Sequence, residues 1–453
     1  MDRRPIAAIF IAAFVLCALL TKTHVASWND GSRFATIDAL TAARTFQIDG
    51  SPYAARLGDK IRFRGRTYSD KPPLLAVLGT AVAFALEPAG VTLRRHAATA
   101  IYLITLLTVG VAFAVGCCYV FAFARLLGFP QRTSAAAAAL AGVGTLSLTY
   151  AVVLVNHVPS GACVLAGCYH AARGRDGARA HALGAGFAFG LAYAFDASAI
   201  LLAVGGVALL WGAPASRWVL AVLGGIPLVA LQVAYNLHVS GSYMPPALNA
   251  SVWNDPSLPL YSWSSQVFAV YSPAAYAGFA ANLLVGSRGL FTYTPLMLLV
   301  AYGVALLWRA GGLRRRLALA ITGSTAVFFA AILFLQNDTI SSNFGERRYV
   351  DIAFLAGTAL APALAGVRGA LGTGLARLVI AASVAITALG TVAPFGGRAN
   401  ESGFAFAGAE FVALARRAPI QAALDVVLLA IVLLLVMRFV PLGAAATAVP
   451  RRG

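Results

Sequence analysis

Two short sequences, WNDGSRFATI at residues 28–37 and YSDKPPL at residues 68–74, stand in a polar stretch between the first apolar run of the chain and the second. They place an acid and several cations beside apolar segments. Because 60% of the residues are hydrophobic and only 11% are charged, charge at this place needs a reason. Ionisable residues at or within a membrane are candidates for function.

The composition identifies the class of protein. The mean hydropathy is +0.80, whereas apolar residues make up only about half of a water-soluble globular chain. Apolar runs recur along the sequence and predict an all-α polytopic membrane protein with about twelve transmembrane helices, each near the ~20 residues that cross a bilayer. These helices are expected at residues 5–20, 97–124, 134–155, 158–172, 181–195, 197–211, 218–237, 290–308, 317–335, 350–367, 378–394 and 420–437.

The apolar segment 74–86 is shorter, and it decides the topology of everything after it. If it stays at the outer interface, the short basic loops that contain Arg125 and Arg309 are cytoplasmic, as the enrichment of Lys and Arg in such loops requires. Both termini are then cytoplasmic, and Arg94 and Arg95 are the exception left outside. The segments expected to face outward are 23–72, 156–157, 238–287, 336–348 and 395–417.

The net charge of +18 is explained largely by these loops, where Lys and Arg set topology and contact anionic lipid headgroups. No nucleic-acid partner is needed to explain it. The first apolar run follows Arg3 and Arg4 without a convincing cleavage site, which indicates an uncleaved signal anchor. The cysteines all lie in apolar runs, which fits neither a disulfide framework nor a zinc site: Cys17, Cys117, Cys118, Cys163 and Cys168.

Aromatic residues are dense in the outward segment 238–287, where Tyr243, Trp253, Tyr261 and Trp263 stand outside any predicted span. Aromatics in this position most often form an interfacial belt. A surface on which sugars stack is the more specific alternative.

The motifs of the first loop resemble those of a known superfamily. Asp30, Arg33, Phe34 and Ala35, followed by the sequence KPPL at 71–74 and an apolar run, are similar to the C-superfamily of membrane glycosyltransferases. The likeness is to the lipid A aminoarabinose transferases and protein O-mannosyltransferases. Weaker matches are the sequences YN at 235–236, GL at 289–290 and GERRY at 345–349. The chain departs from the pattern at Gly31, where many relatives have a second acid.

This resemblance implies transfer of a sugar from a polyprenyl-phosphate donor to an acceptor hydroxyl on the outer face, with inversion at the anomeric carbon. It also implies one membrane-embedded domain over 1–453, in which residues 23–96 form the outer catalytic loop with interfacial helices. The plasma membrane, or inner membrane, is the expected location. The acceptor stays open between a lipid, a glycan and a protein.

The chemistry of such a transfer requires a base and cations, and the first loop contains both. An acceptor hydroxyl needs a carboxylate to take its proton, and Asp30 is the expected base. The departing phosphate needs cations, for which Lys71, Arg33, Arg347 and Arg348 are the candidates. Relatives often carry a further acid after the third span, where this chain has Asn156 and His157. The candidates for a second base or an acceptor contact are His157 and Glu346.

Each of these residues also has a structural alternative. Asp30 could cap an interfacial helix that begins near Ser32, and Lys71 could be an anchor that reaches the interface. Arg347 and Arg348 could pair with Glu346 or Asp351, and adjacent helical residues point in different directions, so at most one of the two arginines is expected in the site. His157 could cap a helix. Asp196, between two predicted spans, is most simply a turn residue.

No metal is predicted, although a divalent metal is a possibility that the superfamily leaves open. The first loop holds Asp38, Asp49, Asp59 and Asp70 among six basic residues. Such a mixed-sign run is usually a solvated face. No spacing selects two of these acids as ligands.

Two other functions are compatible with charge beside an apolar groove. A non-enzymatic transporter or flippase for a polyprenyl-linked glycan is the main alternative, and a structural membrane subunit that binds a partner through its first loop is the other. Only the enzyme requires Asp30, Lys71 and one of the two adjacent arginines to converge on one place.

Overall fold

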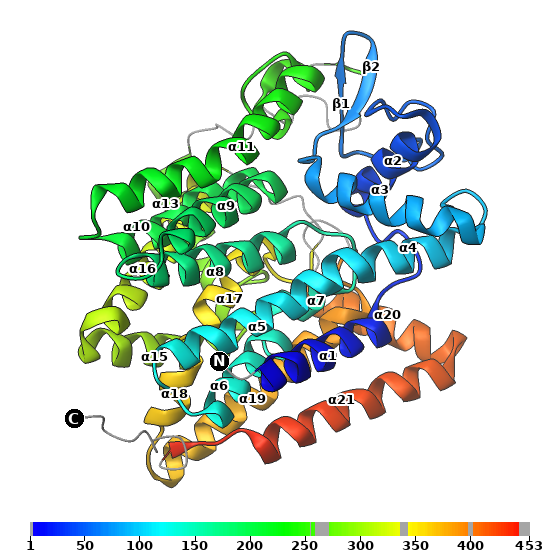
Figure 1. The fold of residues 1–453 in the computed structure, drawn as a ribbon. Helices are drawn as coiled ribbons and strands as arrows, with labels where there is room; N and C mark the ends of the chain where they lie inside the picture. The colour runs from blue at the N-terminus through cyan, green and yellow to red at the C-terminus, as the bar shows by residue number, and fades with distance from the viewer. Residues whose placement is uncertain (1–2, 254, 259–270, 336–342, 397–401, 444–453) are drawn as a thin grey trace.

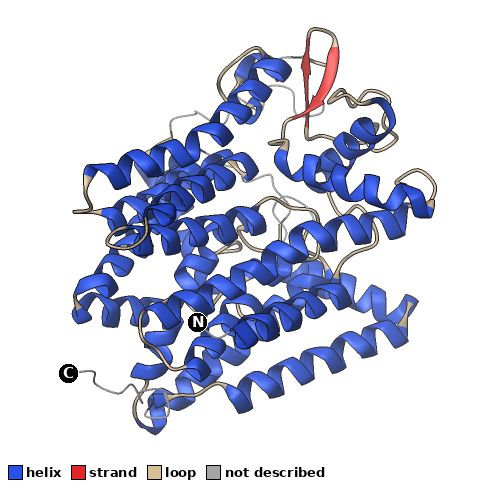
Figure 2. Ribbon diagram, in the orientation of Figure 1, coloured by secondary structure: helices blue, strands red, loops and turns tan. Residues whose placement is uncertain are grey.

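The computed structural model describes residues 3–253, 255–258, 271–335, 343–396 and 402–443. Apart from one two-stranded hairpin, these residues form helices and connecting loops (Figure 2). The expected all-α class is confirmed, and the chain is a multi-pass membrane protein. In chain order the helices are α1 (Arg3–Leu20), α2 (Trp28–Ala43), α3 (Leu74–Leu86), α4 (Ala97–Thr105), α5 (Val111–Leu126), α6 (Gln131–Val143), α7 (Leu146–Ala151), α8 (His157–Gly174), α9 (Arg179–Phe195), α10 (Val204–Leu210), α11 (Ala215–Ser240), α13 (Pro273–Val285), α14 (Leu290–Tyr293), α15 (Met297–Ala310), α16 (Gly312–Leu335), α17 (Val350–Gly357), α18 (Leu360–Gly366), α19 (Gly369–Val392), α20 (Gly403–Arg417) and α21 (Pro419–Phe439).

Five helices of the described chain are long and apolar enough to cross a membrane. Two more spans would come from bent pairs, in which α13 and α14 meet α15 at 89° and the helix that includes α17 meets α18 at 58°. Each of the predicted segments falls on a helix or an interrupted helix. The predicted number of twelve spans is not confirmed, because several of these helices are too short to be counted by length.

The continuous helix predicted over 134–155 is wrong. Helix α6 ends at Val143, and the Thr145 hydroxyl accepts a hydrogen bond from the Ser147 amide at 3.2 Å, which caps the start of α7. Beyond Val152 the chain leaves the helix and reaches Asn156, just before α8. This non-helical stretch positions Asn156 and His157 at the start of α8.

The first outer loop contains the two interfacial helices expected there, α2 and α3, and also the hairpin of β1 (Lys60–Phe63) and β2 (Arg66–Ser69), which the sequence did not predict. The two connecting residues, Arg64 and Gly65, have φ of 50° and 75°. Positive φ at both positions is the requirement of a type I′ turn, which matches the twist of a two-residue hairpin. Lys71 follows the second strand by two residues.

The hairpin packs on the end of α11. Tyr68 lies in a buried cluster with Val239 of α11 and with Trp253, which is 1% exposed. Trp253 is therefore a core residue and no member of an interfacial belt. Tyr243 is exposed, whereas Tyr261 and Trp263 lie outside the described residues.

Helix α3 is the segment on which the topology depends. Its 13 residues extend about 20 Å, which is short of the ~30 Å hydrocarbon core, and it packs against α2. The exceptional Arg94 pairs with Asp38 of α2, with Nε 2.8 Å from Oδ1 and Nη2 2.9 Å from Oδ2. Asp38 is 1% exposed, so this acid of the first loop is buried and ion-paired, where a solvated face was expected.

The ends of the helices are arranged as this topology requires. The hairpin and α2 lie at the upper right of Figure 1, whereas α1 begins and α21 ends toward the left and lower left. Helix α11 ends beside the hairpin. The first loop and the end of α11, two places predicted to face outward, therefore lie on one side of the molecule.

The topology is tested by two matched cysteine variants. Ala55→Cys, exposed in the first loop, should react with an impermeant maleimide added to intact cells, because that loop is expected outside. Ala310→Cys, exposed at the end of α15, should react only after permeabilisation. The unmodified chain measures labelling of its own cysteines. Reversed labelling of the two variants would contradict the topology.

Candidate functional site

Asp30 lies in the first turn of α2, and its carboxylate faces the residues before the helix. Oδ2 accepts a hydrogen bond from the Ala26 amide at 2.8 Å, and Oδ1 accepts from the Ser27 amide and the Ser27 hydroxyl, each at 2.7 Å. With Ser27 as the N-cap, this is a capping box. Burial raises the pKa of Asp30, although these hydrogen bonds act to lower it. Asp30 thus stabilises the start of α2, and its role as a base stays a prediction.

Arg33 is held by amides. It is 1% exposed. Nη1 donates to the Asn29 carbonyl at 2.7 Å and to Asn29 Oδ1 at 2.5 Å, and Nη2 donates to Asn156 Oδ1. Nε is buried without a hydrogen-bond partner, and within the described chain no carboxylate forms an ion pair with Arg33. Burial lowers the pKa of Arg33 to about 10. The guanidinium therefore remains charged at neutral pH, and Asp70, Asp196 and Asp59 act on it without forming a direct ion pair.

Lys71 sits between two acids at the base of the hairpin. Its Nζ lies 2.7 Å from Asp70 Oδ2 and 2.8 Å from Asp59 Oδ2. Burial raises the pKa of Asp70, whereas for Asp59 the attraction of Lys71 outweighs burial and lowers the pKa. Ser32 of α2 joins this group, because its hydroxyl contacts Ser69 Oγ at 2.7 Å and the Asp59 carbonyl at 2.6 Å. The same contacts hold the hairpin on α2.

Arg347 and Arg348 point to different partners, as the adjacency rule predicts. Arg347 Nη1 donates to Asn343 Oδ1 at 3.1 Å, and its guanidinium lies 5.8 Å from the centre of the Phe395 ring. Arg348 forms a bidentate pair with Glu346, Nε to Oε1 at 2.6 Å and Nη2 to Oε2 at 2.8 Å. Burial disfavours the charge of Glu346, but Arg348 lowers its pKa to about 2. The pairing alternative thus fits Arg348, while Arg347 has an amide partner.

His157 faces two acids. Its Nδ1 lies 2.7 Å from Asp351 Oδ2 and 3.2 Å from Asp196 Oδ2. Asp196 caps the short helix after α9 by accepting from the Ser198 amide and hydroxyl, so it is the turn residue that was expected. Asp351 pairs with His157 and with neither adjacent arginine. The close approach of α8 and α17 depends on Gly161, where a Cβ would lie 2.6 Å from the Val350 carbonyl oxygen.

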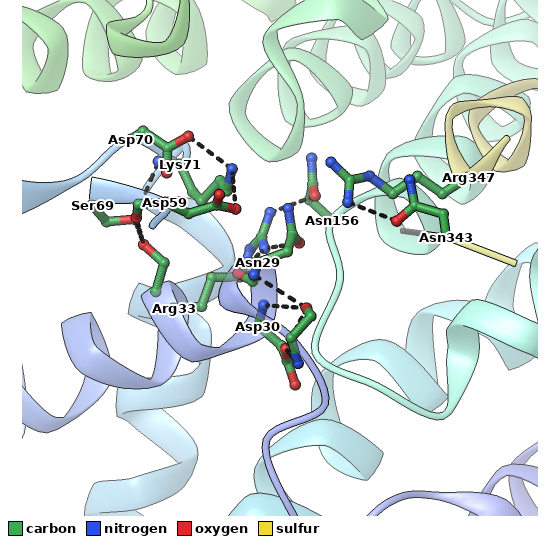
Figure 3. A network of polar contacts seen from close by, with 12 residues as sticks. Asn29, Asp30, Arg33, Asp59, Ser69, Asp70, Lys71, Asn156, Asn343 and Arg347 are labelled. Atoms are coloured by element: carbon green, nitrogen blue, oxygen red, sulfur yellow. Dashed lines mark hydrogen bonds and ion pairs between the residues drawn. The ribbon is translucent and has the colours of Figure 1, made fainter. Parts of the chain in front are cut away.

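The structure brings Arg33, Lys71 and Arg347 together from three parts of the chain (Figure 3). Burial lowers the pKa of Arg33 most, Asp70 opposes this, and Arg347 is close enough to lower the pKa further. Both arginines help to keep Asp59 ionised. Asp30 lies beside this group in Figure 3, but its carboxylate is bonded within the capping box. Arg348 and Glu346 bond to each other.

Sequence reasoning missed the three asparagines that hold the arginines. Asn29 precedes the predicted base, and Asn343 stands four residues before Arg347. Asn156 links two groups, because its Oδ1 accepts from Arg33 and its Nδ2 donates to Asp196 Oδ2 at 2.5 Å. An asparagine produces no periodic pattern in a sequence. Only its closeness along the chain to the charged candidate residues could have indicated its role.

An apolar cavity of about 230 Å³ lies between α1, α19 and α21. Leu20 and Val392, at the ends of α1 and α19 that are predicted to face outward, line it together with Leu429 of α21. Asp425 is the one charged residue in its lining. The cavity is therefore suited to hydrocarbon along most of its wall.

Comparison with known proteins gives structural matches and no sequence matches. No protein-family model matches the chain, and no curated protein matches it. The structure is similar to that of ArnT from Cupriavidus metallidurans in the apo state, with a TM-score of 0.54 and 16% identity over 96% of this chain and 77% of that one. ArnT bound to undecaprenyl phosphate gives 0.48 and 14% over 97% and 77%. The oligosaccharyltransferase of Archaeoglobus fulgidus gives 0.45 and 12% over 89% of this chain and 56% of its own.

The match to apo ArnT establishes a shared fold. The resemblance predicted from the first-loop motifs is thus confirmed for the fold alone. Identity of 16% carries no activity from one chain to the other.

Proposed function

We propose that this chain is a membrane glycosyltransferase that moves a sugar from a polyprenyl-phosphate donor to an acceptor hydroxyl on the outer face of the membrane, with inversion. The observation that carries the proposal is that Arg33 and Arg347 lie close to each other and that no carboxylate directly contacts either guanidinium within the described chain. Both arginines are held by asparagine amides, and neither forms an ion pair within the described chain.

Arg33 is buried and Arg347 is half-buried. Charge without a direct counterion at such places is costly, which is why it indicates an anionic ligand. A buried ion without a partner costs several kcal/mol in practice. The amides of Asn29, Asn156 and Asn343 orient the two guanidiniums without neutralising them. A phosphate placed between them would neutralise this charge and could use the unpartnered Nε of Arg33. Lys71 would add a third cation that is shared with Asp59 and Asp70.

The proposed reaction uses these cations at the leaving group. The acceptor oxygen forms its bond to the anomeric carbon on the face opposite the phosphate, and the bond from that carbon to the phosphate oxygen breaks. Negative charge grows on the phosphate as it leaves, and Arg33, Arg347 and Lys71 stabilise it. The acceptor loses its proton to a base, which we propose to be Asp30, the position that the motif resemblance selects. The hydrogen bonds to Asp30 leave one lone pair of Oδ2 free for this proton.

The lipid part of the donor needs an apolar path, and the acceptor stays open between a lipid, a glycan and a protein. The cavity between α1, α19 and α21 offers apolar walls that include Leu20 and Val392, at the ends of α1 and α19 that are predicted to face outward. The fold shared with apo ArnT supports a membrane-embedded transferase of this kind. A flippase for a polyprenyl-linked glycan would use the same cations and the same groove, but it would leave the sugar on its carrier.

A transfer assay separates these functions. Membranes that contain the chain, supplied with radiolabelled polyprenyl-phosphate sugars and candidate acceptors, should move label from the carrier to an acceptor. Movement of the intact lipid-linked sugar across the membrane without transfer would support the flippase. In every variant below, protein level and membrane insertion are measured alongside transfer.

The first variants separate Asp30 as a base from Asp30 as a cap. Asp30→Asn keeps the bulk and one acceptor of the capping box but removes the base, so transfer should be abolished while donor binding persists. Ser27→Ala removes the partner of the capping box and leaves the carboxylate. It should lower the free energy of unfolding by about 1 kcal/mol and leave turnover measurable. Equal, partial losses of turnover in both variants would show that Asp30 acts only as a cap.

The second set tests the phosphate site through the donor KM. Arg347→Gln and Lys71→Ala should each raise it by about tenfold to hundredfold, because a charge-assisted hydrogen bond contributes about 1.5–3 kcal/mol. Lys60→Ala is the matched control, since the ammonium of Lys60 donates to the Ala54 carbonyl, and its donor KM should not change. A donor KM that stays constant in Arg347→Gln would exclude this site for the phosphate.

A further inference from the structure

We propose that His157, Asp196 and Asp351 hold a divalent cation. One ligand atom of each residue, Nδ1 of the histidine and a carboxylate oxygen of each aspartate, lies within 4.8 Å of the other two. The three residues come from the starts of α8 and α17 and from the end of α9. This set shares no member with the acids of the first loop.

A single proton on His157 cannot form good hydrogen bonds to both aspartates. Asp351 Oδ2 and Asp196 Oδ2 both face the same nitrogen, His157 Nδ1, at 2.7 Å and 3.2 Å. An imidazole Nδ1 carries at most one hydrogen, so it can direct a good hydrogen bond to only one of these oxygens. Two carboxylates that face one buried point repel each other. A protonated His157 would compensate only one of their two charges. A divalent ion would contact all three atoms at once.

Two further polar atoms at the same place lack partners. Asp351 Oδ1 and Ser160 Oγ are both buried without a hydrogen bond, and both residues are 0% exposed. Ser160 belongs to the first turn of α8 with His157, and its hydroxyl lies near the Asp351 carboxylate. Buried polar atoms without partners are rare and need an explanation. A cation gives one, because Asp351 could bind it through Oδ1 as well, and a water on the cation could bond to Ser160.

The distances and the donor set fit a metal ion of the first transition series. Ligands at about 2.0–2.2 Å from such an ion are about 3–3.5 Å apart in tetrahedral or octahedral geometry. The observed separations of 2.7 Å and 3.2 Å need only a small expansion to reach this range. One imidazole with two carboxylates suits manganese or zinc, whereas magnesium and calcium prefer oxygen ligands alone.

The ligands are fixed by their surroundings, as a metal site requires. Asp196 accepts from the Ser198 amide at 2.9 Å and the Ser198 hydroxyl at 2.6 Å, both through Oδ1, which leaves Oδ2 toward His157. Gly161 lets the backbone of α17 approach α8, and Asp351 is held there. Asn156 donates to Asp196 Oδ2 at 2.5 Å.

Asn156 also connects the cation site to the phosphate site. Its carbonyl oxygen accepts from Arg33, and its amide nitrogen donates to a proposed metal ligand. A bound cation would compensate the carboxylates, so that the charge of Arg33 acts on the phosphate alone. This role rests on the proposed function, whereas binding of the cation rests only on the geometry of its three ligands.

Manganese binding to the purified full-length chain in lipid nanodiscs tests the proposal. After treatment with a chelator, the chain should bind one Mn²⁺, counted by the loss of the electron paramagnetic resonance signal of free Mn²⁺. Pulsed measurements on the bound ion should detect one imidazole nitrogen, a readout that needs no variant. A chain that binds no Mn²⁺, or binds it without nitrogen coupling, overturns the proposal.

Variants locate the ion without reference to turnover. Asp351→Asn and His157→Gln should each weaken Mn²⁺ binding by at least about tenfold. Asp38→Asn, which removes an equally buried carboxylate from its pair with Arg94, should leave binding unchanged. Normal binding by Asp351→Asn would overturn the proposal, as would loss of binding in Asp38→Asn alone. A chain that binds Mn²⁺ at these ligands but transfers no sugar would support the cation site and contradict the proposed function.

Discussion

The bonds of Arg33 to Asn29 and Asn156 join the first outer loop to the helix bundle, and the arrangement of the site depends on them. Arg33 and Asn29 belong to α2, whereas Asn156 stands just before α8. The same asparagine bonds to Asp196 after α9. One buried guanidinium thus fixes α2 over the ends of α8 and α9. The hydrogen bond between Ser32 of α2 and Ser69 also holds the hairpin, which Lys71 follows, on α2.

The choice of amides over carboxylates gives this link its chemical meaning. A carboxylate opposite Arg33 would neutralise it and would make a purely structural ion pair, as Glu346 does for Arg348 and Asp38 for Arg94. The chain therefore contains both kinds of arginine. The neutralised ones hold the fold together, while those that face amides are the ones that we propose to bind an anion.

The class of the fold could be predicted from the sequence, and so could the presence of Arg33 and Lys71 in one loop, for identifiable reasons. Composition and apolar runs determine which segments are helices, and the motif around Arg33 and Lys71 placed both residues in one loop. The predicted span 134–155 is interrupted where Thr145 caps the start of α7. A single capping residue is a weak signal beside a long apolar run, so the sequence predicted one continuous helix. Asp351 was read as a partner for an arginine, because nothing in the sequence indicates that Gly161 brings α17 beside His157. Asp30 shows the limit of motif reasoning, since the same residue fits both a base and a capping box.

A structure of the chain with a polyprenyl phosphate, determined by electron microscopy in lipid nanodiscs, tests the central claim most directly. The account predicts the phosphate within ion-pair distance of both Arg33 and Arg347, with the asparagines still bonded to the guanidiniums. A phosphate bound away from both arginines, for example beside Asp425 in the cavity of α1, α19 and α21, would contradict it.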